Sequence, residues 1–97
     1  MIGADLTGLD LSGFDLTGAN LTRVDLSGAD LFQADLTEAN LTETILTWSN
    51  MTEANVGGAN LTGASLTGAN LTEADLKDAI LTGVIGADFT GALNVLD

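Results

Sequence analysis

A period of five residues runs through this chain and excludes both common kinds of secondary structure. Leucine or another apolar residue recurs at every fifth position from Leu6 to Leu81, which gives 16 consecutive repeats. In an α-helix, five residues advance by about 500°, so successive leucines step round by about 140° and form no stripe. In a strand, side chains alternate with period two, so successive leucines would point to opposite faces. The chain must therefore bend once in every repeat.

Each position of the repeat has its own composition. Ala stands two residues before the central Leu in 11 of the repeats, and Asp or Asn directly precedes the Leu in 13. Thr or Ser follows the Leu in 13 repeats, and the fifth place is Gly in 8 and mostly polar otherwise. Ala and Leu, two residues apart, lie on one side of a short extended segment. We therefore predict that Ala and Leu face inward and that the turn falls after the Leu, where Gly supplies a positive φ. Repeated turning in one sense builds a solenoid of stacked coils.

The segment ANLTEADLKD, residues 69–78, shows the resemblance that this pattern carries. Over residues 4–83 the repeats resemble the pentapeptide-repeat family. The resemblance implies an all-β fold, a right-handed quadrilateral β-helix (β-solenoid) of about four coils of four pentapeptides. Asn recurs at a spacing of twenty, at Asn20, Asn40 and Asn60, which supports a coil of that length. We assign residues 1–83 to the β-helix and residues 84–97 to a phase slip, a last partial turn and a C-terminal cap of the same domain.

Large apolar residues mark both ends of the predicted rod. Leu9 and Phe14 occupy inward places that are usually Ala, and we expect them to fill the open N-terminal end. An uncovered solenoid end exposes unpaired N–H and C=O groups and favours end-to-end self-association. At the other end, the residues expected to cover the final coil or to associate are Val84, Phe89, Leu93, Val95 and Leu96.

The composition argues against an enzyme. The chain has no His and no Cys, and its core is predicted to be narrow and filled. Catalysis needs a nucleophile with a base, a metal cluster or perturbed carboxylates in a cleft. We therefore predict no enzymatic activity, no cofactor and no metal. Thr44 and Ser49 take the small inward place, and we expect each hydroxyl to bond a nearby backbone carbonyl.

Charge and hydropathy exclude two further classes of partner. Fourteen acidic and two basic residues give a net charge of −12. Direct binding to nucleic acid is not expected, because affinity for phosphates comes from Lys and Arg. No apolar run approaches the roughly 18 residues of a membrane helix, and no signal peptide precedes the repeats, so we expect a cytoplasmic protein without membrane insertion.

The favoured function is a structural or protein-interaction scaffold, because solenoids offer extended surfaces. Its partner would be an unidentified protein or the remainder of a longer chain. Ile45 and Trp48 break the polar rule of their places on the first face, and Phe32, one coil earlier on the next face, extends this candidate contact. Trp is enriched where binding energy concentrates.

Two alternative functions use other faces of the rod. Some proteins of the resembled family imitate DNA and inhibit a type II topoisomerase, and an acidic face would serve that role. Its candidate residues lie on the second and third faces: Asp10, Asp30, Glu53 and Glu73, then Asp15, Asp35 and Asp75. The minor alternative is ice binding by the nearly neutral fourth face, where Asn and Thr form regular ladders.

Overall fold

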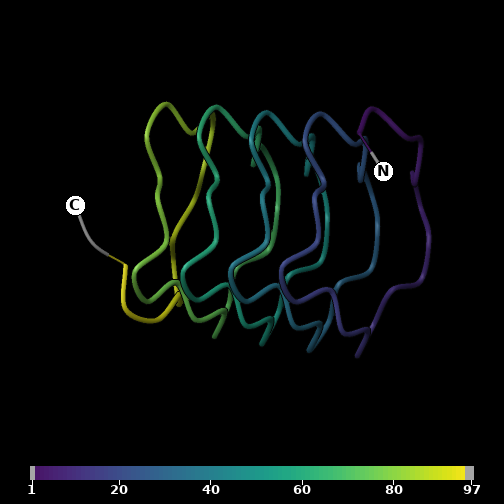
Figure 1. The fold of residues 1–97 in the computed structure, drawn as a ribbon. Helices are drawn as coiled ribbons and strands as arrows, with labels where there is room; N and C mark the ends of the chain where they lie inside the picture. The colour runs from purple at the N-terminus through teal and green to yellow at the C-terminus, as the bar shows by residue number, and fades with distance from the viewer. Residues whose placement is uncertain (1, 96–97) are drawn as a thin grey trace.

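The computed structural model describes residues 2–95 as a short rod. Figure 1 shows coils of similar size stacked along one axis, with the earliest residues at one end and the latest at the other. The rod measures 30 × 23 × 23 Å. Within residues 2–95 the secondary structure consists of turns and isolated parallel β-bridges, without helices or longer strands.

The bridges join residues that are 20 positions apart. Asp25, for example, pairs with Ile45, and Ile45 pairs in turn with Ser65. The Leu26 N–H donates to the Ile45 carbonyl at 2.7 Å, and the Ile45 N–H donates to the Val24 carbonyl at 2.9 Å. Each coil therefore holds four five-residue repeats and has four faces. We name the faces by the bridge residues that stack on them: first, 5, 25, 45, 65 and 85; second, 10, 30, 50 and 70; third, 15, 35, 55 and 75; fourth, 20, 40, 60 and 80.

A tight turn at each corner separates one face from the next. The N–H of Ala29 donates to the Leu26 carbonyl at 3.0 Å, which closes a four-residue turn, and the other repeats follow the same pattern. The third residue of the turn has a positive φ at every fifth position from Gly3 to Gly83, whether or not it is glycine. This is the mark of a type II turn. The predicted turn after the Leu is confirmed. Its left-handed backbone position also accepts residues other than glycine, such as Arg23 and Trp48.

The interior is filled by the Ala and Leu residues that the repeat pattern assigns to it. Leu26, Leu46 and Ala54 are each at most 1% exposed. The Thr44 hydroxyl donates to the Leu21 carbonyl and the Ser49 hydroxyl to the Leu46 carbonyl, both at 2.8 Å, which confirms the expectation for these buried groups. Among the described residues, every buried side-chain nitrogen or oxygen atom has a hydrogen-bond partner.

The last coil is two residues shorter than the others. Ser65 pairs with Ile85, 20 positions on, but Asp75 pairs with Leu93, only 18 positions on. The shortening follows Ile85, where Gly86 passes so close to Thr67 that an added Cβ would lie 2.2 Å from the Thr67 Oγ1. A side chain there would force Thr67 to move, and the φ of +68° also favours glycine. The repeat then resumes with Phe89 packed against the core.

Enlarging an inward alanine in the middle of the rod tests this packing. We expect Ala54→Leu to lower the free energy of unfolding by about 1–3 kcal/mol, because added methylenes have no space in a close-packed core. Urea denaturation of the variant and the parent measures the difference. Ala4→Leu is the matched control, because Ala4 is only partly buried and Leu9 already stands in the equivalent place of the next repeat. Equal stability of the Ala54→Leu variant and the parent would contradict the inward assignment.

Candidate interaction surfaces

The outward Asp and Asn residues bind the turn that follows them. The Oδ1 of Asp10 accepts from the Ser12 backbone N–H at 3.0 Å and from the Ser12 hydroxyl at 2.6 Å. Asn40 makes the same pair of contacts with Thr42, at 3.1 and 2.6 Å. This side-chain turn explains why Asp or Asn stands two residues before Thr or Ser in most repeats.

These contacts lower the pKa of several aspartates. The Ser12 hydroxyl, followed by the Ser12 N–H, lowers the pKa of Asp10, and the corresponding groups of Thr17 lower that of Asp15. For Asp75, the side-chain amide of Asn94 is the largest cause, and it donates to Oδ1 at 2.9 Å. In Asp10, Asp15 and Asp75 these contacts therefore favour the ionised carboxylate.

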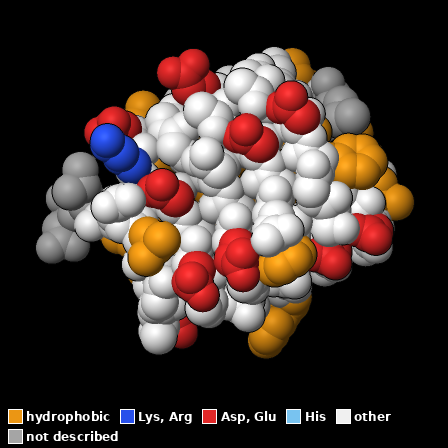
Figure 2. Space-filling model, turned by 90° about the horizontal axis from the view of Figure 1, so that it is seen from below, with side chains coloured by type: hydrophobic (Ala, Val, Ile, Leu, Met, Phe, Trp, Pro, Cys, Tyr) orange, Lys and Arg blue, Asp and Glu red, His pale blue; other side chains and the backbone are white. Residues whose placement is uncertain are grey.

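The structure distributes the predicted acidic residues over two faces and a corner. Asp10 bridges to Asp30 on the second face, and Asp15 bridges to Asp35 on the third, where Asn55 separates Asp35 from Asp75. Glu53 and Glu73 lie at a corner of the rod, and Glu53 accepts from the side-chain amide of Gln33 at 3.1 Å. Figure 2 shows acidic side chains scattered with hydrophobic ones between them, rather than gathered into one row.

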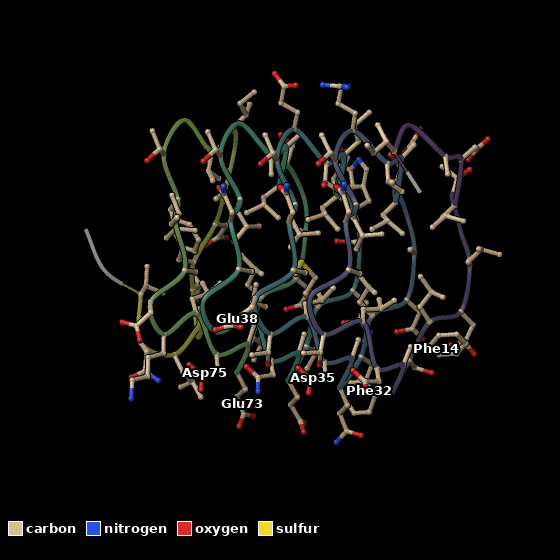
Figure 3. All side chains as sticks on the ribbon, viewed as in Figure 1. Phe14, Phe32, Asp35, Glu38, Glu73 and Asp75 are labelled. Carbon is tan, nitrogen blue, oxygen red and sulfur yellow. The ribbon has the colours of Figure 1, made fainter. Side chains whose placement is uncertain are left out.

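A groove of about 410 Å³ crosses the third face. It opens where Gly57 replaces the usual Thr or Ser, so that no side chain fills the space between Glu38 and Asp78. Glu38 folds over Gly58, whose added Cβ would lie 3.2 Å from the Glu38 Cγ. Figure 3 shows Glu38 and Asp75 on the same lower edge of the rod. Among residues 2–95, no acidic side chains converge well enough to hold a metal ion.

The first face carries exposed apolar side chains at two levels. Ile45 is 38% exposed and Trp48 is 72% exposed. Ile85 is 57% exposed, and the bridges from Ile45 to Ser65 and from Ser65 to Ile85 place it in the column of Ile45. We call Ile45, Trp48 and Ile85 the first-face patch. The 20-residue step from Ile45 leads to Ile85, but the five-residue pattern breaks after Gly83 and does not mark this residue.

The indole of Trp48 lies against the backbone of the next coil. An added Cβ on Gly68 would come within 2.4 Å of the Trp48 Cε3. Gly68 stands in the corner place 20 residues after Trp48, and its lack of a side chain lets the ring lie flat over the corner. The ring therefore reaches from the coil of Ile45 towards that of Ile85 while most of its surface stays in contact with water.

Phe32 belongs to a different corner from Trp48. Its carbonyl accepts from the Gly13 N–H at 2.8 Å, directly before Phe14, and its side chain is half-buried. Figure 3 shows Phe32 and Phe14 along the same lower edge, with Phe14 at the N-terminal end. The structure thus places Phe32 at the corner between the second and third faces, whereas Trp48 lies at the corner between the first and second faces.

The two ends of the rod differ. Leu9 and Phe14 are 44% and 51% exposed and line a pocket of about 140 Å³ at the N-terminal end. At the C-terminal end, Val84, Phe89 and Val95 pack against the core. Leu93 pairs through its backbone, but its side chain is 46% exposed and points outward. Leu96 lies outside the described residues.

Within residues 2–95, no helix could cross a membrane.

Comparisons with known proteins agree with this geometry. A family model described as pentapeptide repeats matches in 8 copies, over residues 1–37, 19–56, 29–68, 49–85 and 58–93. A solved pentapeptide repeat protein from the thylakoid lumen of Arabidopsis thaliana is 31% identical, with a TM-score of 0.86, over 98% of this chain and 70% of that chain.

Two solved structures from the cyanobacterium Nostoc are also similar. HetL, a pentapeptide repeat protein involved in heterocyst differentiation regulation, is 32% identical, with a TM-score of 0.76, over 97% of this chain and 48% of its own, so this chain spans about half of it. Another Nostoc pentapeptide repeat protein is 32% identical, with a TM-score of 0.77, over 87% of this chain and 83% of that chain. No curated protein sequence matches the chain.

Two glycines of one column test the seating of Trp48. Gly28 and Gly68 have φ values of +68° and +72°, but an added Cβ on Gly28 meets nothing within 4 Å. We expect Gly28→Ala to lower the free energy of unfolding by about 1–2 kcal/mol through left-handed strain alone. Gly68→Ala should lower it further and change the Trp48 fluorescence, because the methyl group displaces the ring. Identical stability and emission in the two variants would show that the indole does not rest on Gly68.

Acidification tests the contacts of the aspartates. Because the folded-state pKa values of Asp10, Asp15 and Asp35 lie below the ordinary 3.8, the stability they add is present above 3.8 and is lost as the pH falls through the folded values. We expect the melting temperature to fall as the pH drops from neutral to about 3.

The control is the triple variant Asp10→Asn, Asp15→Asn, Asp35→Asn. An amide oxygen accepts the same two hydrogen bonds, as at Asn40, but it does not titrate in this range. On acidification, the melting temperature of the triple variant should therefore fall less than that of the parent protein. A parent protein that becomes more stable in acid would show instead that repulsion between stacked carboxylates dominates.

Proposed function

Because the chain belongs to the pentapeptide-repeat family, whose fold is a right-handed quadrilateral β-helix, we propose that it is a non-enzymatic scaffold that binds a protein partner through the first-face patch. The proposal includes a rod of about four coils of four pentapeptides as the rigid support. Residues 84–97 would act as its slipped partial turn and cap. The partner is another protein or a further part of a longer polypeptide.

The observation that carries this proposal is the position of Trp48. Its side chain is 72% exposed, yet its ring is held against Gly68 instead of extending freely from the corner. A seated aromatic ring loses little conformational entropy on binding, and Trp is enriched among the residues that dominate interface energies. Ile45 and Ile85 flank it along the rod and add apolar area that a partner can cover.

Charge indicates the kind of partner. The chain carries a net charge of −12, and the only ion pair between side chains of residues 2–95 joins Arg23 to Glu43 at 3.5 Å. These two residues lie 20 positions apart, on successive coils, at the corner between the fourth and first faces. A partner with an apolar pocket for the indole and a basic rim would complement this surface. The charges would mainly accelerate association, whereas the apolar residues would supply affinity.

The two alternative functions, DNA mimicry and ice binding, have weaker support. A DNA mimic needs charge in continuous rows, but neutral Asn50 and Asn55 follow the Asp pairs on the second and third faces. On the fourth face, the Thr22, Thr42 and Thr62 hydroxyls donate to the Asn Oδ1 atoms of their own repeats, which leaves these protons unavailable to ice. Ile80 also ends the Asn column. We retain both functions only as alternatives.

Substitutions that restore the repeat pattern test the proposal. Affinity capture with the parent protein identifies a partner, and titration calorimetry with the purified partner measures its dissociation constant. We expect Trp48→Ala and Ile45→Asp each to weaken binding about tenfold or more, because they remove central apolar contacts. Ile45→Asp installs the residue that Asp25 already provides in the same column, so the fold should be retained.

Ile80→Asn is the matched control on the fourth face. Ile80 is 48% exposed, and the change installs the residue found at Asn60 in its column. We expect it to leave affinity unchanged. The proposal fails if a purified partner binds the Trp48→Ala and Ile45→Asp variants as tightly as the parent, or if Ile80→Asn alone weakens binding.

A further inference from the structure

The N-terminal end of the rod is an open hydrogen-bonding edge. On later coils, the residue in the Asp or Asn place directs both its N–H and its carbonyl towards the preceding coil. The Asp25 N–H, for example, donates to the Ala4 carbonyl, and the Asp25 carbonyl accepts from the Leu6 N–H. Within residues 2–95, no coil precedes the first one. Among residues 2–95, the corresponding backbone groups have no backbone partner at any of the four faces, at Asp5, Asp10, Asp15 and Asn20.

The centre of the same end is apolar and hollow. A pocket of about 140 Å³ opens there, and every lining residue is Leu or Phe. Leu9 and Phe14 form part of its rim and are about half exposed. Ile2 is 58% exposed, and the Gly3 N–H donates to the Thr22 carbonyl, so residues 2–3 pair along the rod rather than across its end. An apolar centre within a ring of unpaired backbone groups resembles one half of a coil-to-coil contact.

The geometry points to a second copy of this chain as the occupant: we propose that two copies associate through their N-terminal ends, first coil against first coil, as a two-fold symmetric dimer. An ordinary peptide strand could pair with one face only. A ring of four paired donors and acceptors is matched by another coil of the same cross-section. Two such coils placed end to end run in opposite directions round the common axis, so their backbones meet antiparallel.

Antiparallel pairing suits the unpaired groups. In an antiparallel ladder, directly opposite residues can exchange both an N–H and a carbonyl bond. Each residue of the open ring presents both groups on the same side, as its counterparts on later coils do. Reversed order round the ring places Asp10 of one copy opposite Asp15 of the other, for example, and Asp5 opposite Asn20. Leu9 and Phe14 of both copies would then close the two pockets against each other.

The C-terminal end does not offer the same surface. There, the last coil has lost two residues from its circumference, because Asp75 pairs with Leu93, only 18 positions on. Its outline therefore differs from that of the open first coil. Contact between N-terminal ends also closes on itself, whereas contact between unlike ends would continue into a fibre.

Size and charge predict a weak dimer whose affinity depends on salt. With cross-sectional dimensions of 23 × 23 Å, the two ends would bury about 1,000 Å² in total, which is near the lower limit for a specific interface. Each copy carries a net charge of −12, so electrostatic repulsion opposes the contact. Salt screens that repulsion, and the dimer should strengthen as the ionic strength rises to about 0.15 M and above.

Sedimentation equilibrium of the 97-residue chain tests the proposal. We expect a monomer–dimer equilibrium in the micromolar range that shifts towards the dimer with added salt. Phe14→Glu should weaken the dimer by about tenfold or more, since it places a charge at the centre of the contact. Ile80→Glu is the matched control, because Ile80 is 48% exposed, close to the 51% of Phe14, but lies on a side face. Thermal denaturation of both variants verifies that they remain folded.

Amide hydrogen exchange locates the contact independently of substitution. The N–H groups of Asp10, Asp15 and Asn20 should exchange quickly at low protein concentration and more slowly when the dimer forms. Three results would overturn the proposal: a monomer at every concentration and ionic strength, equal weakening by Ile80→Glu and Phe14→Glu, or a dimer that leaves exchange at these three amides unchanged.

Discussion

Parallel backbone bridges between residues 20 positions apart determine every surface of this protein. They fix which side chains share a column, so that Ile45 stands in line with Ile85, and Trp48 lies over Gly68. They also stack aspartates of like charge, as at Asp10 and Asp30. At Asp10 the backbone N–H and hydroxyl of Ser12 bind the carboxylate, and at Asp30 the Phe32 backbone N–H does so. The same bridges explain the edge at the N-terminal end, where no earlier coil among residues 2–95 supplies backbone partners.

Much of the architecture follows from the sequence because the five-residue pattern has few physical solutions. Inward Ala and Leu, outward Asp and Asn, and a bend after each Leu are all required if the chain is to bury its apolar residues. The inward hydroxyls of Thr44 and Ser49 were also predictable, since a buried hydroxyl needs an acceptor and a backbone carbonyl lies within reach. Family resemblance added the four-sided shape, which composition does not specify.

Other features depend on contacts that periodicity does not encode. The pattern marks the aspartates as outward but does not reveal that they bind the turn two residues ahead. Trp48 is visibly unusual, but its seat on Gly68 depends on a neighbour 20 residues away and on a left-handed corner. Leu93 suggests a cap, yet its side chain points outward because the shortened last coil places it opposite Asp75. The repeat pattern does not mark Ile85, because it weakens after Gly83.

The 20-residue step is the central claim, and disulfide formation tests it directly. The chain contains no cysteine, so two introduced cysteines report only on each other. Bridged residues on adjacent coils lie about 4.8 Å apart, within the range that a disulfide spans. The double variant Asn40→Cys, Asn60→Cys should therefore oxidise readily to an intramolecular disulfide. Asn40→Cys with Asn55→Cys, on different faces, should not. Rapid disulfide formation between positions 40 and 55, or the absence of a disulfide between positions 40 and 60, would contradict the account.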